Sequence, residues 1–199
     1  MRTFVLRSRK GSVKADRIED QIGTNAHVEI IAHALANAFF YSNGIREDVE
    51  AYVVLDSSAD FPRTVRLIAN QGLSLPGFHE TAILSVISQA LAAAKKIVKD
   101  QILSVAPGIE VAGFGFERLM QKLLETRCVY LLDTKGDDVR NITLEQDCVI
   151  VLSDHLAMPK NHIKSFERRG LKKISLGRKM LFASQCVVLV HHELDRQLG

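Results

Sequence analysis

The chain has 199 residues, of which 47% are hydrophobic and 25% charged, as is ordinary for a globular domain. No apolar run approaches the ~18 residues that a membrane span requires, and the first twenty or so residues carry charges where a signal peptide needs an unbroken apolar stretch. We therefore expect a cytoplasmic protein with no membrane partner. The formal net charge of +3 is too small to indicate nucleic-acid binding by itself.

Cysteine and histidine usage argues against a metal site. The three cysteines, Cys128, Cys148 and Cys186, form no C-x-x-C pair, and their odd number fits a reducing compartment. The adjacent His191 and His192 point about 100° apart on a helix, so they cannot converge on one ion as an HExxH pair does. We expect no structural or catalytic metal.

Hydrophobic periodicity predicts strands and helices in alternation through the first half of the chain. The segment 8–23 is polar and is expected to be a surface loop. The expected elements are a strand at 3–7, a helix at 26–41 with Asn25 as its N-cap and 43–44 as its stop, strands at 50–56 and 63–69, and a helix at 80–105 ended by Pro107-Gly108.

The second half continues the alternation, with Gly113-Phe114-Gly115 expected to be a strand-to-helix turn. The expected elements are strands at 109–112, 128–133, 148–154 and 172–176, an acidic turn at 134–138, and helices at 116–125, 161–169 and 184–198. Apolar strands alternating with helices predict an α/β protein with a parallel sheet covered on both faces. No linker interrupts residues 1–199, so we expect a single domain.

Three loops at strand ends form the best candidate ligand site. They follow Leu132, follow Leu152, and lie at Leu176-Gly177. Ligands of parallel sheets collect where strands end, because loops there offer unpaired backbone groups. Such loops could read the edge of an adenosine-sized ligand while Leu132, Leu176 and Leu181 enclose its faces. The alternative is that these loops are ordinary turns.

The same loops carry a family resemblance. The segments LLDTKG (131–136), IVLSDHLAMP (150–159) and ISLGRKMLFASQCVVLVHHELDR (174–196) resemble the cofactor loops of the SPOUT methyltransferases. They are most similar to the tRNA pseudouridine-54 N1-methyltransferases, the TrmY family. The similarity extends through TFVLR near the N-terminus and PRTVRLI in the middle of the chain.

The resemblance implies a SPOUT fold with a deep trefoil knot within about 128–199, a homodimer, and transfer of a methyl group from S-adenosyl-L-methionine to N1 of a pseudouridine in tRNA. The cofactor contacts it implies are Leu132, Ser153, Leu176, Gly177, Arg178, Lys179, Met180, Leu181 and Cys186. Relatives tend to carry glycine at Ser153 and often at Ala157, so the second loop is expected to hold the cofactor differently here.

Candidate residues for chemistry and RNA binding lie outside these loops. Asp60 is the candidate base or base-orienting group and Arg63 the candidate contact to phosphate or carbonyl, with Asp154 as a second acid; the alternative for Asp60 is a turn before Pro62. The candidate RNA contacts are Arg66, then Lys164, Arg168 and Arg169 in the basic run 160–179, with Arg7, Arg9 and Lys10. Two other functions stay open: methylation of a different RNA or atom, and RNA binding without catalysis.

Overall fold

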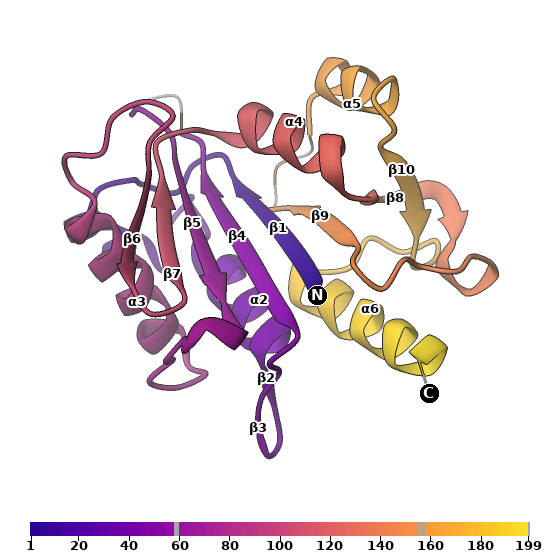
Figure 1. The fold of residues 1–199 in the computed structure, drawn as a ribbon, viewed down its shortest axis with the longest axis horizontal. Coiled ribbons are helices and arrows are strands. Elements are labelled where there is room, and N and C mark those ends of the chain that lie inside the picture. The colour runs from indigo at the N-terminus through magenta and orange to yellow at the C-terminus, as the bar shows by residue number, and fades with distance from the viewer. Residues whose placement is uncertain (58–59, 155, 157, 199) are drawn as a thin grey trace.

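A computed structural model describes residues 1–57, 60–154, 156 and 158–198, and it is built on an eight-stranded sheet in the order β10-β8-β9-β1-β4-β5-β7-β6 (Figure 1). The strands are β1 (Arg2–Ser8), β4 (Val49–Leu55), β5 (Arg63–Ile68), β6 (Ile102–Ala106), β7 (Ile109–Ala112), β8 (Val129–Asp138), β9 (Val149–Ser153) and β10 (Lys172–Ser175). A separate hairpin joins β2 (Phe40–Tyr41) to β3 (Gly44–Ile45).

Pairing in the sheet is parallel from β10 through β8, β9 and β1 to β4. The strands β5, β7 and β6 pair antiparallel in succession. The predicted α/β class with a mostly parallel sheet is therefore confirmed. In the parallel half, four neighbouring strands, β10, β8, β9 and β1, end at the same edge of the sheet, and loops gather there.

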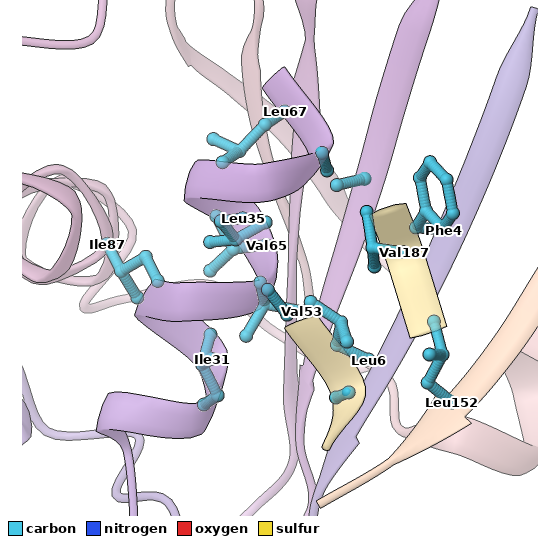
Figure 2. Close-up of a cluster of buried hydrophobic side chains, with 14 of the residues drawn as sticks. Phe4, Leu6, Ile31, Leu35, Val53, Val65, Leu67, Ile87, Leu152 and Val187 are labelled. Carbon is cyan, nitrogen blue, oxygen red and sulfur yellow. The ribbon is translucent and has the colours of Figure 1, made fainter. Parts of the chain in front are cut away.

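Helices cover both faces of the sheet. They are α1 (Ala15–Ile18), α2 (Glu29–Phe39), α3 (Glu80–Ala93), α4 (Phe116–Thr126), α5 (Lys160–Glu167) and α6 (Ala183–Leu198). The larger core lies between the sheet and α2, α3 and α6, where Phe4, Leu35 and Val187 are fully buried (Figure 2). The smaller core places Phe116 and Met120 of α4 and Phe166 of α5 against the opposite face. The last helix thus packs on the face opposite to α5.

The predicted helix at 80–105 is wrong in its second half, because α3 ends at Ala93 and residues 102–106 form the edge strand β6. Gly108, with φ of +68°, makes the tight turn that lets β6 pair with β7, and Ala106 faces Ile109 across it. The apolar residues of 97–105 fit a helical stripe, but in the structure residues 102–106 form backbone hydrogen bonds with β7 in a hairpin beside β5.

Three smaller expectations also differ from the structure. The polar segment 8–23 contains α1, because Ile18 is fully buried against the core. The helix α2 begins at Glu29, after His27 turns the chain with φ of +51°, so Asn25 is not its N-cap, and it ends at Phe39. Residues 134–138, expected as an acidic turn, belong to β8, which runs to Asp138. The glycine pair at 113–115 is the expected strand-to-helix turn between β7 and α4.

Candidate functional site

A cavity of about 340 Å³ lies at the carboxyl ends of β9 and β10 and beside residues 131–135 of β8, where the three candidate loops meet. Its walls include eight of the nine predicted contacts, and Arg178 is the one outside. The lining residues are Leu131, Leu132, Asp133, Thr134, Lys135, Ser153, Met158, Lys160, Ile163, Leu176, Gly177, Lys179, Met180, Leu181 and Cys186. The structure thus brings together three separate loops from residues 131–186.

The first wall of the cavity comes from an excursion within β8. Leu131 pairs with Lys173 of β10, and the next pair in the register is Asp137 with Ile174. Residues 132–136 of β8 therefore fall between two consecutive residues of β10. Asp133 stabilises this excursion by accepting a hydrogen bond from the backbone N–H of Lys135 at 2.9 Å. A bulge of this kind redirects side chains at the edge of a site.

Glycine is required where the excursion rejoins β10. A Cβ atom on Gly136 would lie 2.5 Å from the backbone nitrogen of Ile174 and 2.6 Å from its carbonyl carbon. Backbone atoms on both strands cannot yield as a flexible side chain can. The close approach of these two strands therefore depends on the missing side chain of Gly136.

The third wall is a turn that opens directly after β10. The hydroxyl of Ser175 accepts a hydrogen bond from the N–H of Gly177 at 3.1 Å and donates one to its carbonyl at 3.2 Å. Gly177 has φ of +126°, a conformation that other residues rarely adopt. Beyond it the chain reaches α6. The N–H of Phe182, the residue before this helix, donates a hydrogen bond to the side chain of Gln185 at 3.0 Å.

The lining fits an adenosine-containing cofactor. Leucine side chains from the first and third loops, Leu132, Leu176 and Leu181, supply apolar walls, while the loops expose backbone groups. A volume of about 340 Å³ falls within the range of small-molecule sites. Burial raises the pKa of the Cys186 thiol to about 11, so it is neutral at physiological pH and acts as an apolar contact, not a nucleophile.

Asp154 lies between this cavity and the end of β1. Its backbone N–H donates to the carbonyl of Arg7 at 3.0 Å, which continues the pairing of β9 with β1. Its carboxylate accepts hydrogen bonds from the backbone N–H groups of Arg9 and Leu156, each at 2.9 Å. The carboxylate is therefore held in a fixed position one residue beyond Ser153.

The predicted catalytic pair lies away from the cavity. Asp60 forms an ion pair with Lys14 at 3.6 Å. The guanidinium of Arg63 donates to the backbone carbonyls of Phe61, Pro62 and Ile97 at 3.2–3.3 Å. Neither side chain is among the residues that line the cavity.

The candidate RNA contacts divide into two groups. Arg66 is half-buried and forms ion pairs with Glu50 at 2.6 Å and Glu110 at 3.0 Å, so its charge is already neutralised. Lys164 of α5, together with Arg168 and Arg169 just after it, is exposed. The exposed group lies on the helix that follows the second loop of the cavity. The departure noted at Ala157 falls outside the described residues.

Several lining residues were not predicted, namely Leu131, Asp133, Thr134, Lys135, Met158, Lys160 and Ile163. Most adjoin the strand ends in the sequence, and extending each loop by a few residues would have found them. Ile163 required the orientation of α5. In the described part of the chain no helix is long and apolar enough to cross a bilayer, and no group of three or more histidine, cysteine or acidic residues could hold a metal ion.

Comparison with known proteins identifies the family. Residues 1–198 match the family described as "Putative SAM-dependent RNA methyltransferase". A protein of Vibrio parahaemolyticus is 43% identical over 195 residues, covering 98% of both chains, and one of Shewanella frigidimarina is 43% identical over 198 residues, covering 100% of both. Each bears the name "Putative pseudouridine methyltransferase".

Among solved structures, Archaeoglobus fulgidus Nep1 bound to S-adenosylhomocysteine has a similar fold, with a TM-score of 0.67, 14% identity and coverage of 98% of both chains. At this identity the likeness concerns the fold alone. The full-length family match and the 43% identity of the relatives carry the assignment. The chain belongs to this family of S-adenosylmethionine-dependent RNA methyltransferases.

Proposed function

We propose that the cavity at the ends of β8, β9 and β10 binds S-adenosyl-L-methionine and that the protein transfers its methyl group to N1 of a pseudouridine in tRNA. The convergence of three separate loops on one apolar cavity is the observation that carries this proposal. The names of the relatives support pseudouridine as the acceptor. The resemblance to the tRNA pseudouridine-54 N1-methyltransferases supports tRNA as the substrate RNA and N1 as the methylated atom.

The residues of the chain have separate tasks in this reaction. Bound S-adenosyl-L-methionine supplies an electrophilic methyl group. Leu132, Leu176 and Leu181 hold the donor in place and exclude water, which favours an in-line displacement. N1 of pseudouridine carries a proton that must leave as the bond forms, and we assign its acceptance to the fixed carboxylate of Asp154, which follows Ser153 of the cavity wall in the sequence. Asp60 and Arg63 remain candidates on the substrate side.

The homodimer belongs to the same proposal. Four of the apolar side chains that the described chain leaves exposed lie on α6 and the loop before it: Val188 (47% exposed), Leu189 (40%), Phe182 (73%) and Met180 (88%). Contact between two copies would cover this surface and close the mouth of the cavity. Light scattering on the wild type and on Val188→Asp tests this: a monomeric wild type contradicts the dimer.

The trefoil knot is also part of the proposal. The chain passes from α5 on one face, along β10 at the edge of the sheet, to α6 on the other face. This course is compatible with the threading that the resemblance implies. A crystal structure traced through residues 128–198 would show the chain either passing through the loop or lying beside it, and the second result rejects the knot.

Calorimetry with S-adenosyl-L-methionine tests the donor site. We expect binding by the wild type, at least tenfold weaker binding by Leu176→Arg, whose larger charged side chain enters the cavity, and unchanged binding by Leu103→Arg, which places the same group on β6. No detectable binding at millimolar concentration would favour an RNA-binding protein without catalysis.

Mass spectrometry of tRNA and rRNA from a strain lacking the gene tests the acceptor. We expect one methylated pseudouridine to disappear from tRNA and to return when the wild-type gene is restored. Disappearance of a methyl group from any base other than pseudouridine would contradict the proposed acceptor. If the methylated pseudouridine disappears from rRNA instead, the proposed substrate RNA is wrong, but methyl transfer to pseudouridine is retained.

A further inference from the structure

A second and larger cavity, of about 640 Å³, lies beside the donor cavity on the same edge of the sheet. It is formed by the ends of β1, β4 and β7 and by the first turn of α4. Arg7 in its wall is the register partner of Ser153 in the wall of the donor cavity. Because paired residues of neighbouring strands lie about 5 Å apart, the two cavities adjoin across the β1–β9 boundary.

Arg7 is a buried arginine whose hydrogen-bonding capacity is not fully used. Its side chain is only 7% exposed, its guanidinium lies 4.5 Å over the ring of Phe116, and its Nε and Nη2 donate to Asp56 at 3.0 and 2.6 Å. Its Nη1 atom is buried and has no hydrogen-bond partner among the described residues. A buried donor without an acceptor is unfavourable, and an oxygen atom of a ligand would satisfy it.

The first turn of α4 lines the same cavity and has no side-chain cap. Gly115 stands at its N-cap position and therefore supplies no side chain to cap the helix, and residues 115–118 line the cavity. A Cβ atom on Gly115 would lie 2.9 Å from Asp56 and 3.0 Å from Pro62, so the close packing of this turn excludes a capping side chain. An uncapped helix start attracts the oxygens of an anion such as a phosphate.

Charged residues of both signs line the cavity, and most of the acids are neutralised. Asp56 is paired with Arg7, and Asp100 is paired with Arg118 at 3.3 Å. The third acid, Glu117, lies 3.1 Å from His162. Lys99 is exposed at the rim and forms no ion pair with a described residue. The lining therefore has positive charge to spare for one phosphate group.

Phe61 provides an aromatic surface at the rim. Its side chain is 45% exposed, and the guanidinium of Arg63 lies 4.9 Å from the centre of its ring. An exposed ring beside cationic side chains is the usual platform on which proteins stack an unpaired nucleobase. The other phenylalanines of the wall, Phe114 and Phe116, are buried and shape the interior.

We propose that this second cavity binds one extruded nucleotide of the substrate RNA, with its base stacked on Phe61 and its phosphate near Lys99, Arg118 and the first turn of α4. Nη1 of Arg7 then donates to an oxygen of that nucleotide. This inference rests on the proposed methyl transfer and assigns its acceptor site. An acceptor base inside a folded RNA arm must leave its stack to reach the donor, and the second cavity would bind it beside the donor cavity.

Binding of pseudouridine 5′-monophosphate, followed by ligand-observed NMR, tests the site without RNA or donor. We expect saturable binding that weakens with added salt, and weaker binding of the uncharged nucleoside. Phe61→Ala and Arg118→Ala should each weaken binding at least fivefold. Both side chains are about half exposed, so the variants should fold.

Matched controls are available elsewhere on the surface. Phe78→Ala removes another exposed phenylalanine, and Arg140→Ala removes another exposed arginine paired with an aspartate. Both should bind the mononucleotide as the wild type does. Unchanged binding by Phe61→Ala and Arg118→Ala, or equal losses in the controls, overturns the assignment.

Methyl transfer to tRNA separates this inference from the proposed function. If both are right, Phe61→Ala raises KM for RNA while calorimetry shows unchanged affinity for S-adenosyl-L-methionine. If the wild type methylates tRNA and Phe61→Ala leaves KM unchanged, the acceptor site is wrong and the methyl transfer stands. If the wild type binds no donor yet binds the mononucleotide in a Phe61-dependent way, the methyl transfer fails and the nucleotide site stands.

Discussion

Arg2 and His191 are joined by a hydrogen bond of 3.2 Å between Nη1 and Nδ1, although 189 residues separate them. The other ring nitrogen, Nε2, lies 3.0 Å from the carbonyl of Ala38 in α2. The arginine donates to Nδ1, so the imidazole is neutral and carries its proton on Nε2. This one ring therefore ties the last helix to the first strand and to α2.

Acidification should weaken this connection. Burial, with the nearby charges of Arg46 and Arg2, lowers the pKa of His191 from 6.5 to about 4. A group whose pKa is lowered by folding contributes stability that is complete above its unfolded pKa and is lost as the pH falls from about 6.5 towards 4. We expect a loss of about 3 kcal/mol over that range, measured by urea unfolding at several pH values.

The matched variant is His191→Gln, whose amide can donate to Ala38 and accept from Arg2 without titrating. Its stability should be lower than that of the wild type at pH 7.5, and the difference between the two proteins should shrink as the pH falls to 4.5. A constant difference across the range would show that His191 does not contribute to the pH dependence.

Glu50 holds a buried ion cluster together, and its neutralisation should destabilise the fold. Its carboxylate is nearly inaccessible and binds Arg66 and Arg127 at 2.6 Å each and the hydroxyl of Thr3 at 2.8 Å. Glu50→Gln removes the buried charge that the two guanidinium groups share and leaves Arg66 only Glu110 and Arg127 only Asp147, at a cost of about 3–5 kcal/mol in the free energy of unfolding. The control Glu110→Gln removes one half-exposed contact to Arg66 and should cost less than about 1 kcal/mol. Equal losses would contradict this description of the cluster.

Gly136→Ala should damage the donor site and the fold together. The added methyl group collides with the backbone of Ile174, so β8 and β10 must separate, at a cost of about 1–3 kcal/mol. Calorimetry should show loss of donor binding, because both strands carry loops of the cavity. Gly44→Ala is the control, since its Cβ would approach only the side chain of Tyr41, at 3.4 Å. Full donor binding by Gly136→Ala would refute the requirement for glycine.

Replacing Arg168 and Arg169 with alanine should weaken RNA binding without affecting donor binding. Removing a cation that binds a phosphate reduces the slope of log affinity against log salt by about 1, so the double variant should show a slope smaller by about 1 to 2. The double variant Lys95→Ala, Lys96→Ala removes another adjacent pair of exposed cations and should leave the slope unchanged. An unchanged slope in the arginine variant would place the RNA elsewhere.

The sequence predicted those parts of the fold that local patterns encode. Uniformly apolar strands such as 149–153 and the helical spacing of α6 were evident, and the strand-end loops led to the donor cavity. The pattern failed where one apolar stripe fits two structures: Ile97 and Ile102 continue the helical spacing of α3, yet they lie in a turn and an edge strand.

The predicted roles of Asp60 and Arg66 show a second limit. The sequence shows that these residues are charged, and the family resemblance implies that they lie on the substrate side, but neither shows that Lys14 and Glu50 pair with them. Ion pairs between residues far apart in the sequence depend on the register of strands, such as Glu50 with Ile68 and Tyr52 with Arg66. The second cavity was missed for the same reason, since its walls come from four separate parts of the chain.

The third wall of the proposed donor cavity comes from residues 176–186, which follow the residues of the other two walls in the sequence. A nascent chain on the ribosome therefore cannot form this cavity until β10 and the start of α6 have emerged. If the proposed function is right, donor binding cannot guide the early folding of the first strands, which must form on their own core. A chain truncated before residue 176 would lack one wall of the cavity and should not consume the methyl donor.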